Sequence, residues 1–121
     1  MNRLTKAEEE VMQGFWQYGP CTVSQLIAKT SKKNAPHSTI SSIVRILENK
    51  GFVDHKTYGR TYEYFPIIQK KEYSKFSLSR LVTNYFEGSV NELVSFMVKE
   101  KNLSLDELNE LIDHLEKKNH D

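Results

Sequence analysis

The chain has 121 residues, of which 38% are hydrophobic and 27% are charged, and its formal net charge is +1. This length allows one or two small domains. No apolar run reaches the roughly 18 residues of a membrane span. The first residues also lack the apolar segment of a signal peptide, so a cytoplasmic location is expected. Cys21 is the only cysteine, which excludes an internal disulfide and a cysteine-rich metal cluster.

Charge is distributed unevenly along the chain. Residues 1–67 carry nine lysines and arginines against six acids, a balance of +3, whereas residues 68–121 carry eight against ten, a balance of −2. A basic front half and an acidic rear half are typical of a DNA-reading domain joined to an assembly domain. The asymmetry is modest, so the charge distribution is a weaker indication of function than the motifs are.

Capping boxes predict two helices at the start of the chain. The first helix begins at Thr5–Glu8 and ends at Tyr18–Pro20, and the second extends from Thr22 to about Lys29. Trp16 widens the apolar face of the first helix. We interpret it as a core residue, the alternative being an exposed platform on which a base could stack.

Residues 36–51 predict a third helix with one buried face. The apolar residues recur at the i, i+3, i+4, i+7 spacing of such a face, namely Ile40, Ile43, Val44 and Leu47. Pro36 suits the first turn, because its missing N–H has no partner there in any case. Gly51 stands where a helix C-cap belongs.

The opposite face of this helix is polar and predicts a DNA-reading surface. The major groove of B-DNA admits one α-helix, and short polar side chains and arginine read its base edges. The candidate base-reading residues are Thr39, Ser41, Ser42 and Arg45, and the candidate phosphate contacts at or before the helix start are Lys32, Lys33, His37 and Ser38. The alternative is a solvated helix face, on which His37 would simply be exposed.

A β-hairpin is predicted after the third helix. Residues 52–56 and 61–65 are rich in β-branched and aromatic side chains, flank a Gly-containing turn over residues 57–60, and are followed by Pro66. Lys56, Tyr58 and Arg60 near the tip would hold phosphates or enter a minor groove, although a solvated turn would also carry charges. Three helices and a hairpin predict a winged helix-turn-helix domain over residues 1–67.

Residues 68–121 have a helical pattern throughout and predict a dimerisation domain of three helices. Capping boxes at Ser89–Glu92 and Ser104–Glu107 mark the second and third helix. A chain segment of this size seldom builds a sufficient core alone, so its apolar faces are expected to pack against a second copy. The candidate dimer core is Leu81, Tyr85, Phe86, Leu93, Phe96, Leu108, Ile112 and Leu115. The fold class is therefore mainly α with a small β-hairpin.

The residues of catalytic chemistry do not form a recognisable constellation. No serine or cysteine has a plausible base partner, and no glycine-rich loop could hold a phosphate, so no enzymatic activity is expected. His55, His114 and His120 have no metal-ligand spacing with one another or with Cys21. No metal and no cofactor are therefore predicted.

Motifs along the whole chain resemble the penicillinase-repressor family of bacterial transcription regulators, which includes the methicillin-resistance and copper-responsive repressors. In the front half they are Leu4-Thr5-x-Ala7-Glu8-x-x-Val11-Met12-x-x-x-Trp16, Gly19, Thr22-Val23, Ser38-Thr39-Ile40, Leu47-x-x-Lys50-Gly51 and Tyr58-Gly59-Arg60-Thr61-x-x-Tyr64-x-Pro66. In the rear half they are Phe86-x-Gly88-Ser89-x-x-x-Leu93-Val94 and Leu103-Ser104-x-x-Glu107-Leu108. The resemblance implies a homodimer of winged-helix domains, joined by an intertwined helical domain, that blocks transcription at a dyad-symmetric double-stranded DNA operator.

Three departures from the family pattern qualify this expectation. The family often has arginine where this chain has Ile46, and here the arginine is Arg45. The cysteine-rich metal hook of the copper-responsive branch is missing from the tail. In the β-lactam-responsive branch a membrane sensor metalloprotease signals, and the repressor is cut at an Asn-Phe bond. The matching position here is Ser95-Phe96, which keeps the phenylalanine but not the asparagine.

Two other functions fit the same sequence. A winged helix can also serve as a protein-interaction module, and loss of nucleic-acid affinity with added salt would argue against that function. A repressor of this design could instead be released by a small ligand in the dimerisation domain, which a ligand-induced thermal shift would reveal.

Overall fold

The computed structural model describes residues 1–30, 35–101, 104, 106–107, 109–110 and 113. The chain divides into two compact units, Met1–Ser77 and Leu78–Asp121, and each is considered by itself. Within the described part there are five helices and one two-stranded antiparallel sheet, which confirms the predicted fold class. The first unit extends past residue 67, and the domain boundary at 67/68 stays a prediction.

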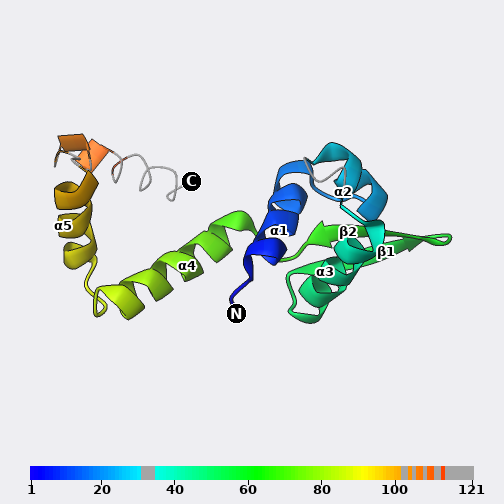
Figure 1. The fold of residues 1–121 in the computed structure, drawn as a ribbon, viewed down its shortest axis with the longest axis horizontal. Helices are drawn as coiled ribbons and strands as arrows, with labels where there is room; N and C mark the ends of the chain where they lie inside the picture. Colours follow the sequence, from blue (N-terminus) through cyan, green and yellow to red (C-terminus); the bar gives the residue numbers. More distant parts are fainter. Residues whose placement is uncertain (31–34, 102–103, 105, 108, 111–112, 114–121) are drawn as a thin grey trace. The chain divides into compact units, whose positions relative to one another are not determined.

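The first unit contains three helices followed by the hairpin (Figure 1). The helices are α1 (Lys6–Tyr18), α2 (Val23–Lys29) and α3 (His37–Asn49), and the strands are β1 (Val53–Tyr58) and β2 (Thr61–Pro66). The two capping boxes predicted for this unit are complete, because Thr5 with Glu8 and Thr22 with Gln25 each exchange two hydrogen bonds. Each box satisfies two of the backbone N–H groups that a helix start leaves without partners.

The core of the first unit lies between the three helices and the base of the hairpin. Its fully buried side chains include Met12, Phe15, Val44, Leu47 and Phe52. Trp16 is half-buried against this core, and its indole N–H donates to the Ile68 carbonyl over 2.9 Å. The interpretation of Trp16 as a core residue is confirmed, because its polar edge has a partner and its ring is packed.

The first turns of α4 (Lys70–Tyr85) belong to the first unit. Tyr73 is 5% exposed, and its ring lies edge-on to Phe52 with centroids 5.6 Å apart. Its hydroxyl also accepts a hydrogen bond from the Leu4 backbone N–H at 3.0 Å. These contacts fix the start of α4 and the N-terminal segment to the same core.

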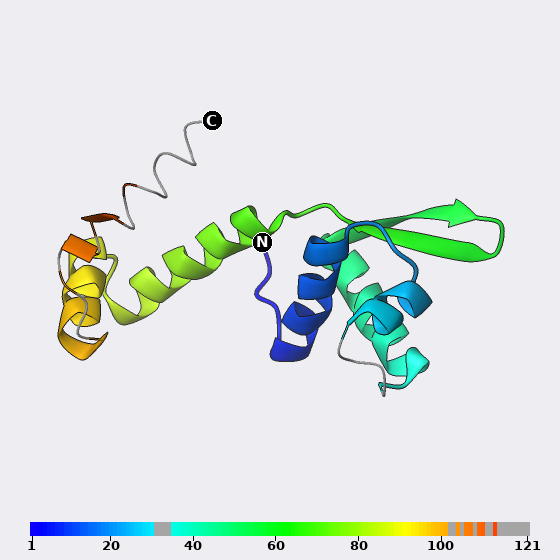
Figure 2. The same cartoon turned by 90° about the horizontal axis from the view of Figure 1, so that it is seen from above.

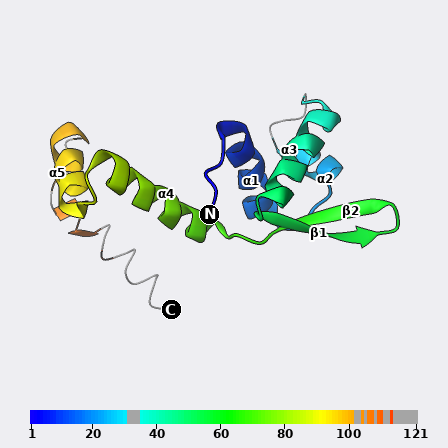
Figure 3. The same ribbon diagram turned by 90° about the horizontal axis from the view of Figure 1, so that it is seen from below.

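The hairpin is tighter than the sequence predicted. The strands pair from Val53 with Pro66 to Tyr58 with Thr61, so Gly59 and Arg60 alone form the turn instead of four residues. Gly59 has φ +60°, which is the conformation required at the first central position of a type II′ turn. Figures 1, 2 and 3 show this turn projecting beyond α1, α2 and α3.

Two long-range contacts hold α2 and α3 in place. Cys21, just before α2, forms an isolated antiparallel bridge with Tyr64 of β2 through two N–H···O bonds of 2.9 Å. Burial raises the pKa of the Cys21 thiol, so it remains a neutral core group. At the end of α3, the Lys50 ammonium lies 2.6 Å from a carboxylate oxygen of Glu8 in α1. Lys50 is itself the cap, and Gly51, predicted as the cap, follows it with φ +83°.

The second unit contains the rest of α4 and α5 (Val90–Lys101). Ser89 accepts a hydrogen bond from the Glu92 N–H at the start of α5, as its capping box predicts. The rings of Phe86 and Phe96 lie 5.5 Å apart. No helix among the described residues has the length and apolar content needed to cross a membrane.

Candidate nucleic-acid interface

One side of α3 is buried and the other is open to solvent. Ile40, Val44 and Leu47 are buried and Ile43 packs against the same core, so the positions on the opposite side of the helix face outward. Of the predicted base-reading residues, Thr39, Ser42 and Arg45 are exposed and Ser41 is half-buried, and the predicted phosphate contacts His37 and Ser38 are exposed at the helix start. Lys32 and Lys33 lie outside the described residues.

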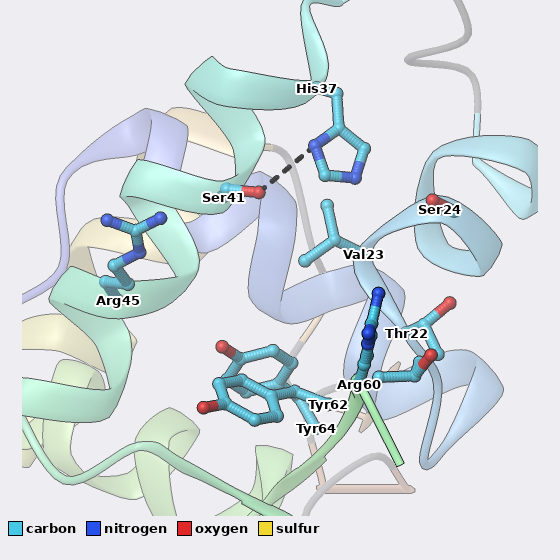
Figure 4. Close-up of a pocket in the computed structure, with 10 residues that line it drawn as sticks. Thr22, Val23, Ser24, His37, Ser41, Arg45, Arg60, Tyr62 and Tyr64 are labelled. Atoms are coloured by element: carbon cyan, nitrogen blue, oxygen red, sulfur yellow. Dashed lines mark hydrogen bonds between the residues drawn. The ribbon is translucent and has the colours of Figure 1, made fainter. Parts of the chain in front are cut away.

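A hollow of about 610 Å³ lies between the start of α2, one side of α3 and the hairpin (Figure 4). We call it the α3–hairpin groove. Its lining residues are Thr22, Val23, Ser24, His37, Ser41, Arg45, Arg60, Thr61, Tyr62 and Tyr64. Arg45 and Arg60 come from different elements, so the fold gathers two permanent cations and several hydroxyl groups at one concave surface.

Hydrogen bonds within α3 already constrain some of the predicted contacts. The Ser42 hydroxyl donates to the Ser38 carbonyl over 2.9 Å, one turn earlier. Ser41 Oγ and His37 Nδ1 lie 3.3 Å apart and share a hydrogen bond whose direction depends on the histidine tautomer. Because a serine has one donor and two acceptor sites, Ser42 retains only acceptor capacity for a ligand.

The two faces of the hairpin carry different side chains. Successive side chains along a strand point to opposite faces of the hairpin, and residues directly opposite each other on the two strands point to the same face. Tyr62 and Tyr64 line the α3–hairpin groove, and the His55 ring stacks on Tyr62 with centroids 4.3 Å apart. Lys56 is on the opposite face, with its ammonium 5.9 Å from the centre of the Phe65 ring.

The three predicted hairpin-tip residues therefore do not converge on one place. Arg60 is in the turn and lines the groove with Arg45, whereas Lys56 and Tyr58 belong to β1 and share its other face. Tyr58 is 59% exposed. Sequence reasoning missed Thr22, Tyr62 and Tyr64 as groove residues. The period-2 alternation of β2 would have put the two tyrosines on one face, but only the folded chain places that face against α3.

Tyr64 contributes a neutral hydroxyl at the base of the groove. It is 7% exposed, and burial is the main reason that its pKa is raised, with the Glu48 carboxylate adding to the effect and Arg45 opposing it. The phenol is protonated at neutral pH, and its O–H can donate a hydrogen bond. The groove thus offers cations and hydroxyl donors, which are the groups that bind phosphate oxygens.

Comparison with known proteins identifies the family. A sequence profile described as penicillinase repressor matches residues 4–117. The chain belongs to the penicillinase-repressor family. The penicillinase repressor of Bacillus licheniformis is 28% identical over 115 residues, covering 94% of this chain and 90% of that protein. The methicillin resistance regulatory protein MecI of Staphylococcus aureus (strain N315) is 27% identical over 116 residues, covering 95% and 94%.

A solved structure from the same family supports the fold. The solution structure of the DNA-binding domain of the repressor BlaI superposes with a TM-score of 0.52 at 29% identity, over 59% of this chain and 88% of that one. The winged-helix prediction is thereby confirmed. These penicillinase-repressor relatives are repressors and not enzymes, which agrees with the expectation that this chain has no catalytic site.

Proposed function

We propose that this family member is a transcriptional repressor that binds double-stranded operator DNA with α3 in the major groove. The observation that carries the proposal is the exposed polar face of α3, Thr39, Ser42 and Arg45, directly beside the cationic α3–hairpin groove. An α-helix fills the major groove, and these side-chain types read base edges. Arg60, on the hairpin side of the groove, would contact the phosphate backbone that borders the bases.

Each base-reading residue has a distinct chemical preference. Arg45 can donate two hydrogen bonds to the O6 and N7 atoms of one guanine. Ser42 already donates within the helix, so it favours a base that offers an amino donor, adenine or cytosine. Thr39 can donate, accept, or contact a thymine methyl group.

The phosphate contacts would come from around the groove. Arg60 projects from the hairpin turn, and His37 lies at the start of α3. Lys32 and Lys33 come shortly before α3 in the sequence and remain candidates for phosphate contacts. Lys56 and Tyr58 lie on the other face of β1 and would contact phosphates of a DNA strand that passes over that face.

Binding by the full chain tests this proposal. High-affinity duplexes selected from a random pool supply the operator, and anisotropy titrations at several salt concentrations compare it with a scrambled duplex. Arg45→Ala should lose about 1–3 kcal/mol on the operator and much less on the scramble. Lys6→Ala removes an exposed cation of α1 outside the groove and serves as the control. Equal losses on both duplexes would assign Arg45 to phosphate, and an affinity insensitive to salt would favour a protein-interaction module.

The proposed DNA-binding form is a homodimer on a dyad-symmetric operator. Leu81, Tyr85 and Phe96 are 40%, 76% and 48% exposed in the single chain, and Phe86 and Leu93 are half-buried. Leu108, Ile112 and Leu115 of the predicted dimer core lie outside the described residues. Large apolar side chains that are exposed to water in the single chain favour an interface in which a second copy of the chain buries them. Sedimentation at micromolar concentration should give twice the chain mass, and a clean monomer would contradict the dimer.

Release from the operator is proposed to follow a cut at Ser95-Phe96. Both residues are exposed in α5, so a cut there would divide the helix that carries much of the proposed dimer surface. A dimer gains about 10²–10⁴ in avidity over one DNA-binding domain, which the fragments would lose. The partner would be a membrane sensor metalloprotease or a downstream protease. Mass spectrometry of the chain from induced cells tests this step, and finding only full-length chain while the target genes are on would rule it out.

A further inference from the structure

Three potential metal ligands meet where α3 joins the hairpin. Glu48 is in the last turn of α3, and Asp54 and His55 are the second and third residues of β1. One ligand atom from each side chain lies within 4.8 Å of those of the other two. The spacing of the histidines and the cysteine in the sequence gives no sign of this group, because two of its three members are carboxylates.

The pair at the centre of this group is already in contact. His55 Nδ1 lies 2.5 Å from Glu48 Oε2, and each of these two side chains is just under one third exposed. The Asp54 carboxylate accepts a hydrogen bond from the His55 backbone N–H at 2.8 Å. The His55 ring is also held by stacking on Tyr62. The imidazole is therefore oriented with Nδ1 toward Glu48 and with the Asp54 carboxylate close by, and the partial exposure leaves an ion a path to the site.

The electrostatic surroundings favour a cation at this position. A helix C-terminus carries a partial negative charge, which basic residues in the last turn normally offset. The last turn of α3 has no basic residue and instead contains Glu48. The Lys50 ammonium that follows is engaged with Glu8. A divalent ion would thus offset two carboxylates and the end of the helix together.

We propose that Glu48, Asp54 and His55 form a binding site for one divalent transition-metal ion, with Zn²⁺ as the best chemical match. Imidazole nitrogen and carboxylate oxygen are both Zn²⁺ ligands, at about 2.0–2.2 Å. Ligand atoms that lie within 4.8 Å of one another can reach these distances by rotation of the Glu48 and Asp54 side chains. The ion would take the place of the direct contact between Glu48 and His55. With three protein ligands the fourth position is left for water, and the ion would join α3 to β1.

The test is direct Zn²⁺ binding to the untagged full-length chain. Calorimetric titration should give one ion per chain, and the thermal midpoint should rise when Zn²⁺ is added. His55→Gln and Glu48→Gln should each weaken binding by at least about tenfold. His37→Gln removes an exposed histidine of the same helix and should leave the affinity unchanged. Circular dichroism without metal shows whether each variant is folded.

A measurement on the wild-type chain keeps the proposal independent of the variants. X-ray absorption of the Zn²⁺-loaded protein should show one imidazole with oxygen ligands and no sulfur. Two imidazoles, or equal affinity in wild type and His55→Gln, would mean adventitious binding to other surface histidines and would overturn the proposal. Absence of saturable binding would do the same. None of these outcomes depends on DNA binding.

Discussion

Replacing Glu8 by glutamine should destabilise the first unit and loosen the anchor of α3. Glu8 is 6% exposed. Its carboxylate accepts from the Thr5 backbone N–H at 2.9 Å and from the Lys50 ammonium at 2.6 Å. Glutamine keeps an oxygen for Thr5 but removes the charge opposite Lys50. The change therefore isolates the ion pair that joins the start of α1 to the end of α3.

The expected cost of Glu8→Gln is about 2 kcal/mol. A hydrogen bond to a charged group contributes roughly 1.5–3 kcal/mol. Losing one partner of a fully buried ion pair costs about 3–5 kcal/mol. Lys50 keeps 25% of its side chain exposed, so water can partly solvate its ammonium and the lower range applies. For a unit of this size, about 2 kcal/mol corresponds to a fall of about 8–16 °C in the thermal midpoint.

The pH dependence provides a second readout for the same pair. Burial, the largest single influence, raises the pKa of Glu8, but the hydrogen bonds from Lys50 and Thr5 and the Lys50 charge together lower it below 4.5. A lowered folded-state pKa gives stability that is fully present above about 4.5 and is lost as pH falls through the folded value. The difference between wild type and Glu8→Gln should therefore shrink below that pH, because glutamine does not titrate.

Thermal and denaturant unfolding between pH 7 and pH 3 measure both effects. Glu9→Gln is the matched control, because it removes a carboxylate from the same helix turn without touching Lys50. Its cost should be about 0.3–1 kcal/mol, the value of a charge near a helix end. A Glu8→Gln midpoint within a degree or two of wild type at pH 7, or a difference that stays constant down to pH 3, would refute the reasoning.

Three further predictions concern the hairpin cations, the dimer and the α1–α2 contact. Arg60→Ala and Lys56→Ala should weaken operator and scrambled duplexes alike and each reduce the salt slope by about one, measured by anisotropy; a selective loss on the operator would mean base reading. Leu81→Glu should yield monomers in sedimentation, whereas Asn84→Glu, at an exposed polar position of the same helix, should not. Gly14→Ala places a Cβ 2.6 Å from a buried leucine Cδ1 of α2. Overpacking of about 1–3 kcal/mol should outweigh the helix gain of about 1 kcal/mol, and a higher urea midpoint would contradict it.

Local sequence patterns determined the elements of this protein. The capping boxes at Thr5 and Thr22 and the apolar periodicity of α3 predicted helices that the structure contains. Gly59 marked the hairpin turn. Each of these signals depends on hydrogen bonds or faces formed by residues within one or two turns, so neighbouring residues encode them. Where the predictions were inexact, at the length of the hairpin turn and the position of the α3 cap, the error was one or two residues.

Tertiary structure decided which side chains meet. The Cys21–Tyr64 bridge, the Glu8–Lys50 pair and the Trp16–Ile68 hydrogen bond join residues 42 to 52 positions apart. No local period fixes such pairs, because they depend on how the apolar faces of α1, α2 and α3 pack. The same packing placed Arg45 and Arg60 around one groove and left Lys56 on the other face of the hairpin. Composition and periodicity therefore predicted a DNA-reading helix, while the groove beside it exists only in the folded chain.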